Sequence, residues 1–114
     1  MRAATVIDLK HLAKYTGGDE KLNAEIFRLF DLQVNELVAR LQSILDARDA
    51  KSWREVTHTL KGAARGIGAF PMADAAADLE PIDLDDRARA SAGIGVLKER
   101  SDAVQAFIRN YLAG

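Results

Sequence analysis

The segment WREVTHTLKGAARGI, which runs from Trp53 to Ile67, carries the clearest periodic pattern in the chain. Because an α-helix turns by roughly 100° per residue, its apolar residues fall within one arc about 100° wide. They are Trp53, Val56, Leu60, Ala63, Ala64 and Ile67. The opposite side carries His58, Lys61, Gly62 and Arg65. The pattern predicts one amphipathic helix that buries the apolar arc and presents His58 to solvent.

Basic residues on this predicted helix project in nearly the same direction as His58, and we call them the basic stripe. They are Lys51, Arg54, Lys61 and Arg65. The formal net charge of the whole chain is −1, so this positive charge is a local feature. Histidine has an unperturbed pKa near neutrality, and its neutral imidazole is an available nucleophile or base. The stripe therefore indicates a docking place for an anionic group beside His58.

Gly62 stands one helical turn after His58, on the same side of the predicted helix. A glycine inside a helix costs about 1 kcal/mol relative to alanine, which a residue chosen only for solubility would avoid. Either a bulky side chain from an adjacent helix packs there, or another molecule approaches closely. We favour the second interpretation, because Gly62 points away from the apolar arc.

The length and composition of the chain narrow the possible functions. A chain of 114 residues can bury its own core, and residues 1–114 are predicted to form one domain. The absence of cysteine excludes thiol catalysis and cysteine zinc sites. The two histidines, His11 and His58, form no HxxxH or HExxH motif, so the sequence does not favour a zinc site. We expect neither a metal nor a cofactor on this chain.

The sequence also argues against membrane and nucleic-acid partners. No apolar run approaches the roughly 20 residues needed to cross a bilayer, and residues 1–8 lack the apolar core of a signal peptide. The basic stripe has only about four cations, no aromatic residues interleave with them, and the net charge is negative, unlike a nucleic-acid-binding surface. We expect a cytoplasmic monomer.

Helix start and stop signals divide the N-terminal part of the chain. Asp8 is the expected N-cap of a short helix that ends near residue 14, before Gly17-Gly18 breaks the chain. Asp19 then caps a long helix that extends to about Ala47. The inward positions of this long helix are predicted to be Leu22, Ile26, Leu29, Phe30, Leu37, Leu41, Ile44 and Leu45.

The His58 helix has its own boundary signals. Either Asp49 or Ser52 caps its start, while Gly66 and Gly68 end it. Pro71 then suits the first turn of a further helix. That helix is predicted over Met72 to Leu79, and Pro81 stops it.

A last helix follows the polar link at residues 83–86. Its inward positions are predicted to be Ile94, Leu97, Val104, Phe107, Ile108, Tyr111 and Leu112. Gly93 and Gly95 make its first half the weakest part of the pattern, because glycine disfavours helix. Four substantial helices joined by short connections predict an all-α protein, an antiparallel up-down four-helix bundle with a short N-terminal helix.

The twelve residues from His58 to Ala69, HTLKGAARGIGA, resemble the signature of histidine phosphotransfer (HPt) domains of bacterial phosphorelays. That signature is His-x-Leu-Lys-Gly followed by small residues, an apolar residue and a glycine. Three other places resemble landmarks of the family: Leu29-Phe30, the polar connection at residues 46–49, and Leu79-Glu80. The resemblance thus extends over the whole chain, and it implies a four-helix bundle.

The resemblance implies a role for each matching residue. His58 would accept a phosphoryl group through its solvent-facing ring nitrogen. Lys61 would help to neutralise that group, Gly62 would leave room for the partner, and Gly68 would close the helix. The implied partners are the aspartates of response-regulator receiver domains and a histidine kinase, which can be a hybrid kinase.

Two features depart from the family pattern. Pro81 follows Glu80 at a point where the helix would be expected to run on, so this helix is predicted to be shortened. Gly93 and Gly95 predict an irregular C-terminal helix. Neither feature involves the residues around His58.

The residues themselves support the same chemistry. A histidine nucleophile forms a phosphoramidate, whose high transfer potential suits a relay, and phosphoryl transfer depends mainly on positioning and charge stabilisation. Lys61 and Arg65 would supply that charge, while Arg54 and Lys51, together with Gly62, would guide docking to an acidic pocket. The chain has no acidic Mg²⁺ cluster and no glycine-rich nucleotide loop. We therefore expect half of a composite site, with Mg²⁺ on the receiver partner, and a phosphocarrier rather than an ATP-dependent kinase.

Several alternatives stay open at this point. A dimerisation domain of a sensor histidine kinase also carries a helical histidine, but it tends to show an acidic residue and a proline-containing sequence just after it. Here Thr59 follows His58. The N-terminal module of a chemotaxis-type kinase has a very similar motif joined to further domains. A helical adaptor that uses the same face without being phosphorylated is the main alternative from another functional class.

Overall fold

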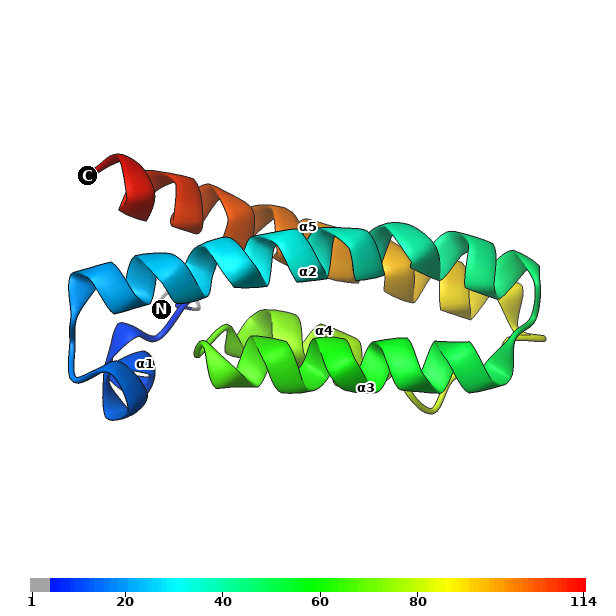
Figure 1. The fold of residues 1–114 in the computed structure, drawn as a ribbon. Helices are drawn as coiled ribbons and strands as arrows, with labels where there is room; N and C mark the ends of the chain where they lie inside the picture. Colours follow the sequence, from blue (N-terminus) through cyan, green and yellow to red (C-terminus); the bar gives the residue numbers. More distant parts are fainter. Residues whose placement is uncertain (1–4) are drawn as a thin grey trace.

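The computed structural model describes residues 5–114, and every regular element in that range is an α-helix (Figure 1). In chain order the helices are α1 (Leu9–Thr16), α2 (Glu20–Asp46), α3 (Ala50–Gly66), α4 (Phe70–Leu79) and α5 (Arg87–Ala113). The signal-peptide expectation rested partly on residues 1–4, which lie outside the described residues. Within residues 5–114, no helix is both long enough and apolar enough to span a bilayer.

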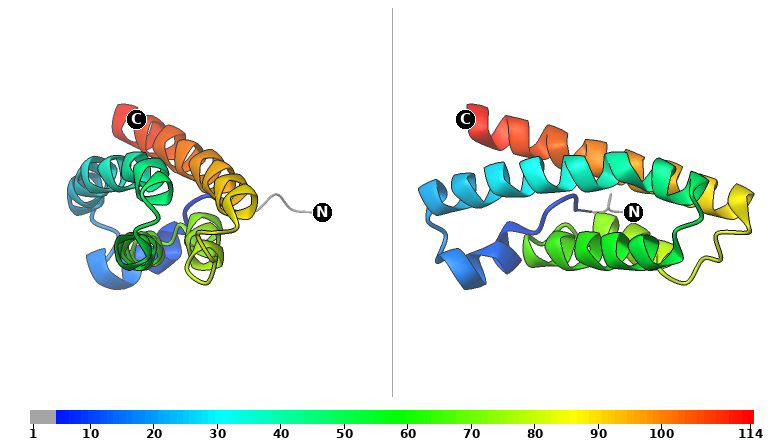
Figure 2. Two further views of the ribbon diagram at one scale, coloured as in Figure 1. Left: turned by 90° about the vertical axis from the view of Figure 1, so that its right-hand side faces the viewer. Right: turned by 45° about the vertical axis from the view of Figure 1, so that its right-hand side comes forward.

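Four of these helices form the bundle, and successive ones run in opposite directions (Figure 1). Helix α3 packs against α2 and α4, and α5 packs against the same two helices. The view along the bundle in Figure 2 shows α2, α3, α4 and α5 around a common core, with α1 at one end beside the start of α2. The predicted all-α four-helix bundle with a short N-terminal helix is confirmed.

Aspartate caps begin four of the helices. Asp8 and Asp19 cap α1 and α2 as predicted, each accepting hydrogen bonds from two backbone N–H groups of the first turn. For α3 the structure selects Asp49, whose carboxylate accepts from the backbone N–H of Ser52 at 3.1 Å and from its hydroxyl at 2.7 Å. Asp86 caps α5 by accepting from the N–H of residue 89.

The turn between α3 and α4 depends on Gly68. Its φ of 83° lies in the left-handed region, which glycine adopts without strain. Its carbonyl accepts a hydrogen bond from the backbone N–H of Asp8 at 2.9 Å, and a Cβ at position 68 would stand 2.6 Å from the Asp8 carbonyl oxygen. Gly68 therefore ends α3 as predicted and also allows the segment before α1 to approach the bundle.

Three leucines predicted to face the core are exposed instead. Leu22, Leu29 and Leu112 have exposed fractions of 39%, 60% and 37%. Leu29 lies between the buried residues Phe27 and Phe30, so it projects from a side of α2 that its neighbours do not cover, whereas Leu22 and Leu112 lie in the terminal turns of α2 and α5. Helices α2 and α5 have 27 residues each, whereas α3 has 17 and α4 only 10. The long helices therefore extend beyond their shorter neighbours.

The C-terminal helix is regular, contrary to the prediction drawn from its glycines. Helix α5 continues without a break from Arg87 to Ala113. A Cβ at Gly93 would stand 2.5 Å from Cδ2 of Leu79, so Gly93 lets α5 approach α4 closely. At Gly95, apart from the adjoining backbone of α5, no atom of residues 5–114 lies within 4 Å of such a Cβ, and nothing in the structure explains that glycine. The predicted shortening of α4 is confirmed, because it ends at Leu79.

Alanine substitutions at the two glycines should affect stability differently. Gly95→Ala adds a methyl group in open space, so the free energy of unfolding should rise by about 1 kcal/mol. Gly93→Ala presses a methyl group against buried Leu79, and overpacking that costs about 1–3 kcal/mol should cancel or exceed the gain. Urea unfolding followed by circular dichroism measures both. If Gly93→Ala were stabilised as much as Gly95→Ala, the packing role of Gly93 would be wrong.

Candidate functional site

His58 lies on the outer face of α3, where 75% of its side-chain surface is exposed. The opposite face of the same helix is buried, with Trp53 at 1% and Leu60 at 0% exposed. The predicted amphipathic helix, and the outward direction of His58, are thus confirmed. Ala63 is the one member of the predicted apolar arc that is only partly buried.

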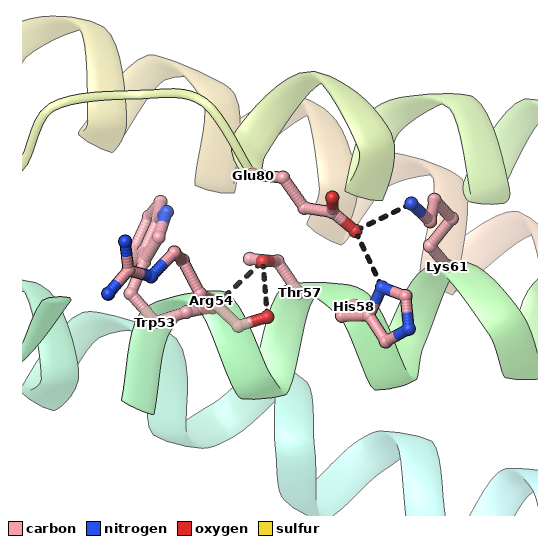
Figure 3. A network of polar contacts seen from close by, with 6 residues as sticks. All are labelled: Trp53, Arg54, Thr57, His58, Lys61 and Glu80. Atoms are coloured by element: carbon pink, nitrogen blue, oxygen red, sulfur yellow. Dashed lines mark hydrogen bonds and ion pairs between the residues drawn. The ribbon is translucent and has the colours of Figure 1, made fainter. Parts of the chain in front are cut away.

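Glu80 reaches His58 from the C-terminal end of α4. One of its carboxylate oxygens, Oε1, lies 3.3 Å from Nδ1 of His58 and 2.8 Å from Nζ of Lys61. Figure 3 shows the carboxylate between these two side chains, which both come from α3. The side chains of Lys61 and Glu80 are only 19% and 28% exposed, so this ion pair is partly sheltered from water.

The neighbours of Glu80 keep it ionised. A hydrogen bond from Lys61 is the main reason that the pKa of the Glu80 carboxyl is lowered from its ordinary value, and His58 acts in the same direction. Partial burial opposes these effects and is outweighed. At neutral pH a carboxylate therefore faces Nδ1 of His58.

This carboxylate determines what the His58 ring offers to solvent. An anion beside Nδ1 favours the neutral tautomer whose proton is on Nδ1, so Nε2 keeps its lone pair. Figure 3 shows the second ring nitrogen turned away from Glu80 and Lys61. The arrangement presents an oriented nitrogen nucleophile on an open helix surface.

The basic stripe is less uniform than the sequence pattern predicts. Lys51, Arg54 and Arg65 are exposed, and none of them forms an ion pair within the described part of the chain. Lys61 instead leans toward α4, where Glu80 already neutralises its charge. The wheel of one helix groups Lys61 with Arg65, but it cannot show that a carboxylate from the next helix pairs with Lys61 alone.

Arg54 points away from His58 in Figure 3. Together with Glu80 and Pro81 it lines a hollow of about 440 Å³ at the start of α3. Arg54 therefore lies beside this hollow rather than beside the His58 ring (Figure 3).

Gly62 faces open space. Apart from the adjoining backbone of α3, a Cβ built there would meet no atom of residues 5–114 within 4 Å. The alternative in which a side chain of an adjacent helix fills this position is thus wrong for the described residues. The geometry supports the other interpretation, in which Gly62 leaves room for another molecule to approach the surface beside His58.

Glu80 is the functional candidate that sequence reasoning did not select. Leu79-Glu80 matched a family landmark, but no pattern in the sequence placed its carboxylate against His58, 22 positions earlier in the chain. Residues 5–114 contain no group of three or more histidine, cysteine, aspartate or glutamate side chains arranged to hold a metal ion.

A four-helix bundle that presents an exposed histidine on one of its helices fits the class of histidine phosphotransfer domains. The sequence model of the Hpt domain matches residues 25–107, and the chain belongs to this family. It therefore has a phosphotransfer role in phosphorelays, in which Hpt proteins are phosphocarriers and not kinases. A search of curated proteins found no match.

The chain is similar in structure to histidine-containing phosphotransfer protein B (HptB) from Pseudomonas aeruginosa PAO1. The two sequences are 25% identical, the TM-score is 0.83, and the match covers 95% of each chain. Because 95% of the chain is covered, the match also includes residues outside the region matched by the family model.

Removing Lys61 should raise the pKa of Glu80. Because this pKa is lowered in the folded state, the Glu80 contribution to stability is present above the unfolded-state value of about 4.3 and is lost as pH falls through the folded-state value. In Lys61→Ala the Glu80 pKa should approach its ordinary value, and acidification should remove less stability. Carboxyl NMR titration and urea unfolding at several pH values measure this. Arg65→Ala is the matched control and should behave as wild type; an unchanged Glu80 pKa in Lys61→Ala would refute the pairing.

Proposed function

We propose that this chain accepts a phosphoryl group on Nε2 of His58 and exchanges it with the aspartate of a response-regulator receiver domain. The observation that carries the proposal is the geometry of the ring: His58 is 75% exposed, while Nδ1 lies 3.3 Å from the Glu80 carboxylate. A nucleophile that must meet an aspartate on another protein has to be both accessible and oriented. The upstream donor is proposed to be a histidine kinase, which can be a hybrid kinase.

The transfer step involves two bonds. The lone pair on Nε2 attacks the phosphorus of an aspartyl phosphate, so that an N–P bond forms while the acyl O–P bond breaks. The aspartate leaves as a carboxylate with the bonding electron pair. The ring keeps its proton on Nδ1 and becomes cationic, so the Glu80 carboxylate faces a developing positive charge and stabilises it. The reverse reaction returns the phosphoryl group to a receiver.

We propose that the charged groups needed for phosphoryl transfer are shared between this chain and the receiver. Lys61, which pairs with Glu80 at 2.8 Å, would also help to neutralise the incoming phosphoryl group. Arg65, Arg54 and Lys51 are exposed and would attract an anionic surface. We propose that the acidic residues and the Mg²⁺ that support phosphoryl transfer belong to the receiver. No ATP-dependent kinase activity is proposed for this chain.

Chemical labelling tests the acceptor directly. Potassium phosphoramidate, a small N-phosphoryl donor that releases ammonia, should give wild type a phosphohistidine signal in ³¹P NMR that is acid-labile and base-stable. His58→Gln should fold normally and lose this signal. His11→Gln is the matched control, because His11 lies on α1, edge-on to Tyr15 and Phe70, and it should keep the signal. A protein that binds a receiver but shows no phosphohistidine would be the non-phosphorylated adaptor instead.

A larger side chain at Gly62 should obstruct the partner and not the fold. Gly62→Gln recovers helix propensity of up to about 1 kcal/mol, but it places a side chain one turn from the reacting nitrogen. Transfer from a receiver domain charged with acetyl phosphate and Mg²⁺ should slow by roughly tenfold or more, while labelling by phosphoramidate should change little. Gly95→Gln, at an equally open helical position on α5, should leave both rates unchanged. Normal transfer by Gly62→Gln would show that close approach does not occur there.

A further inference from the structure

The C-terminal end of α4 is held by a buried hydrogen bond from α3. The indole N–H of Trp53 donates to the carbonyl of Leu79 at 2.8 Å. Trp53 is 1% exposed and Leu79 is 0% exposed, so water cannot replace this bond. Carbonyls in the last turn of a helix lack helical partners and need others. Here the tryptophan supplies one and ties the end of α4 to the helix that carries His58.

The same carbonyl closes the turn that contains Glu80. It also accepts a hydrogen bond from the backbone N–H of Ile82 at 3.1 Å. Glu80 and Pro81 lie between this donor and acceptor, and the proline ring restricts the backbone within the turn. The position of the Leu79 carbonyl therefore determines where the Glu80 side chain begins.

Helix α5 fixes Leu79 from another side. At Gly93 a Cβ would stand 2.5 Å from Cδ2 of Leu79, and 3.5 Å from Cδ1 of Ile82. Because Leu79 is fully buried, a methyl group at position 93 would force either its side chain or the whole end of α4 to move. Gly93 thus acts on the same residue as Trp53 does, although the two belong to different helices.

We propose that Trp53 and Gly93 are positioning residues of the phosphotransfer site, which hold Leu79 so that Glu80 stands against Nδ1 of His58 and Nζ of Lys61. The inference rests on the proposed role of His58. Neither residue would touch the phosphoryl group, and each acts only through Glu80. The end of α4 then links the packing of the core to the orientation of the exposed ring.

Trp53→Phe tests the link, because it keeps an aromatic ring in the core and removes the N–H donor, together with part of the indole volume. The rate of phosphohistidine formation from potassium phosphoramidate should fall by roughly tenfold, as expected when a reacting group loses its orientation. In a Glu80→Gln background the same substitution should have no further effect on the rate, since coupled residues are not additive. Phe27→Leu is the control for general core damage, because Phe27 packs on Phe107 and Tyr111 of α5, and it should leave the rate unchanged.

A second readout does not depend on phosphoryl transfer. In carboxyl NMR titrations, the pKa of Glu80 should be lowered in wild type and in Phe27→Leu, and should approach the ordinary glutamate value in Trp53→Phe. If Trp53→Phe does not fold, Gly93→Ala with Gly95→Ala as its control gives the same comparison. In that pair only Gly93→Ala should change the rate and the Glu80 pKa.

The two proposals fail in distinguishable ways. Absence of phosphohistidine in wild type would overturn the proposed function, whatever the Glu80 titration shows. Wild-type labelling combined with an unchanged Glu80 pKa in Trp53→Phe or Gly93→Ala would overturn the positioning role alone. A rate loss that persists in the Glu80→Gln background would also overturn it, because the effect would then not pass through Glu80.

Discussion

The hydrogen bond from the indole of Trp53 to the carbonyl of Leu79 joins the core of this bundle to its outer surface. It lies inside the protein, yet the residue that follows its acceptor is Glu80, whose carboxylate contacts His58 and Lys61. An unpaired indole N–H or helix-end carbonyl would be costly at this depth, so the bond resists loss. The buried hydrogen bond thereby also keeps the exposed site around His58 rigid.

The glycines of the chain serve different physical purposes. Gly68 adopts a left-handed conformation and admits the backbone before α1, and Gly93 admits Leu79 of α4. Gly62 meets nothing within the described chain and leaves the surface beside His58 open. Gly62 is the glycine that we propose leaves room for a partner. Glycine is thus used at a turn, at a close contact between two helices and on the open surface beside His58.

The cations near His58 also separate into two groups. Lys61 is partly buried and paired with Glu80, so it helps to keep that carboxylate charged beside the imidazole. Arg54, Arg65 and Lys51 remain exposed on α3 and have no partner in residues 5–114. Lys61 therefore acts on the His58 ring through Glu80, while the other three cations are available for contact with another protein. This division suits a carrier that must be oriented before its partner arrives.

Local patterns in the sequence determined the helices, the aspartate caps of α1 and α2, the outward direction of His58 and the family, because each depends on neighbours within a few positions. They could not decide that Leu29 would be exposed beside the buried Phe30, since the packing of the helices determines which part of a helix surface is covered. These local patterns also could not show that Gly93 packs against Leu79, or that Glu80 contacts both His58 and Lys61. Those contacts join separate helices, and only tertiary packing brings such residues within a few ångströms of each other.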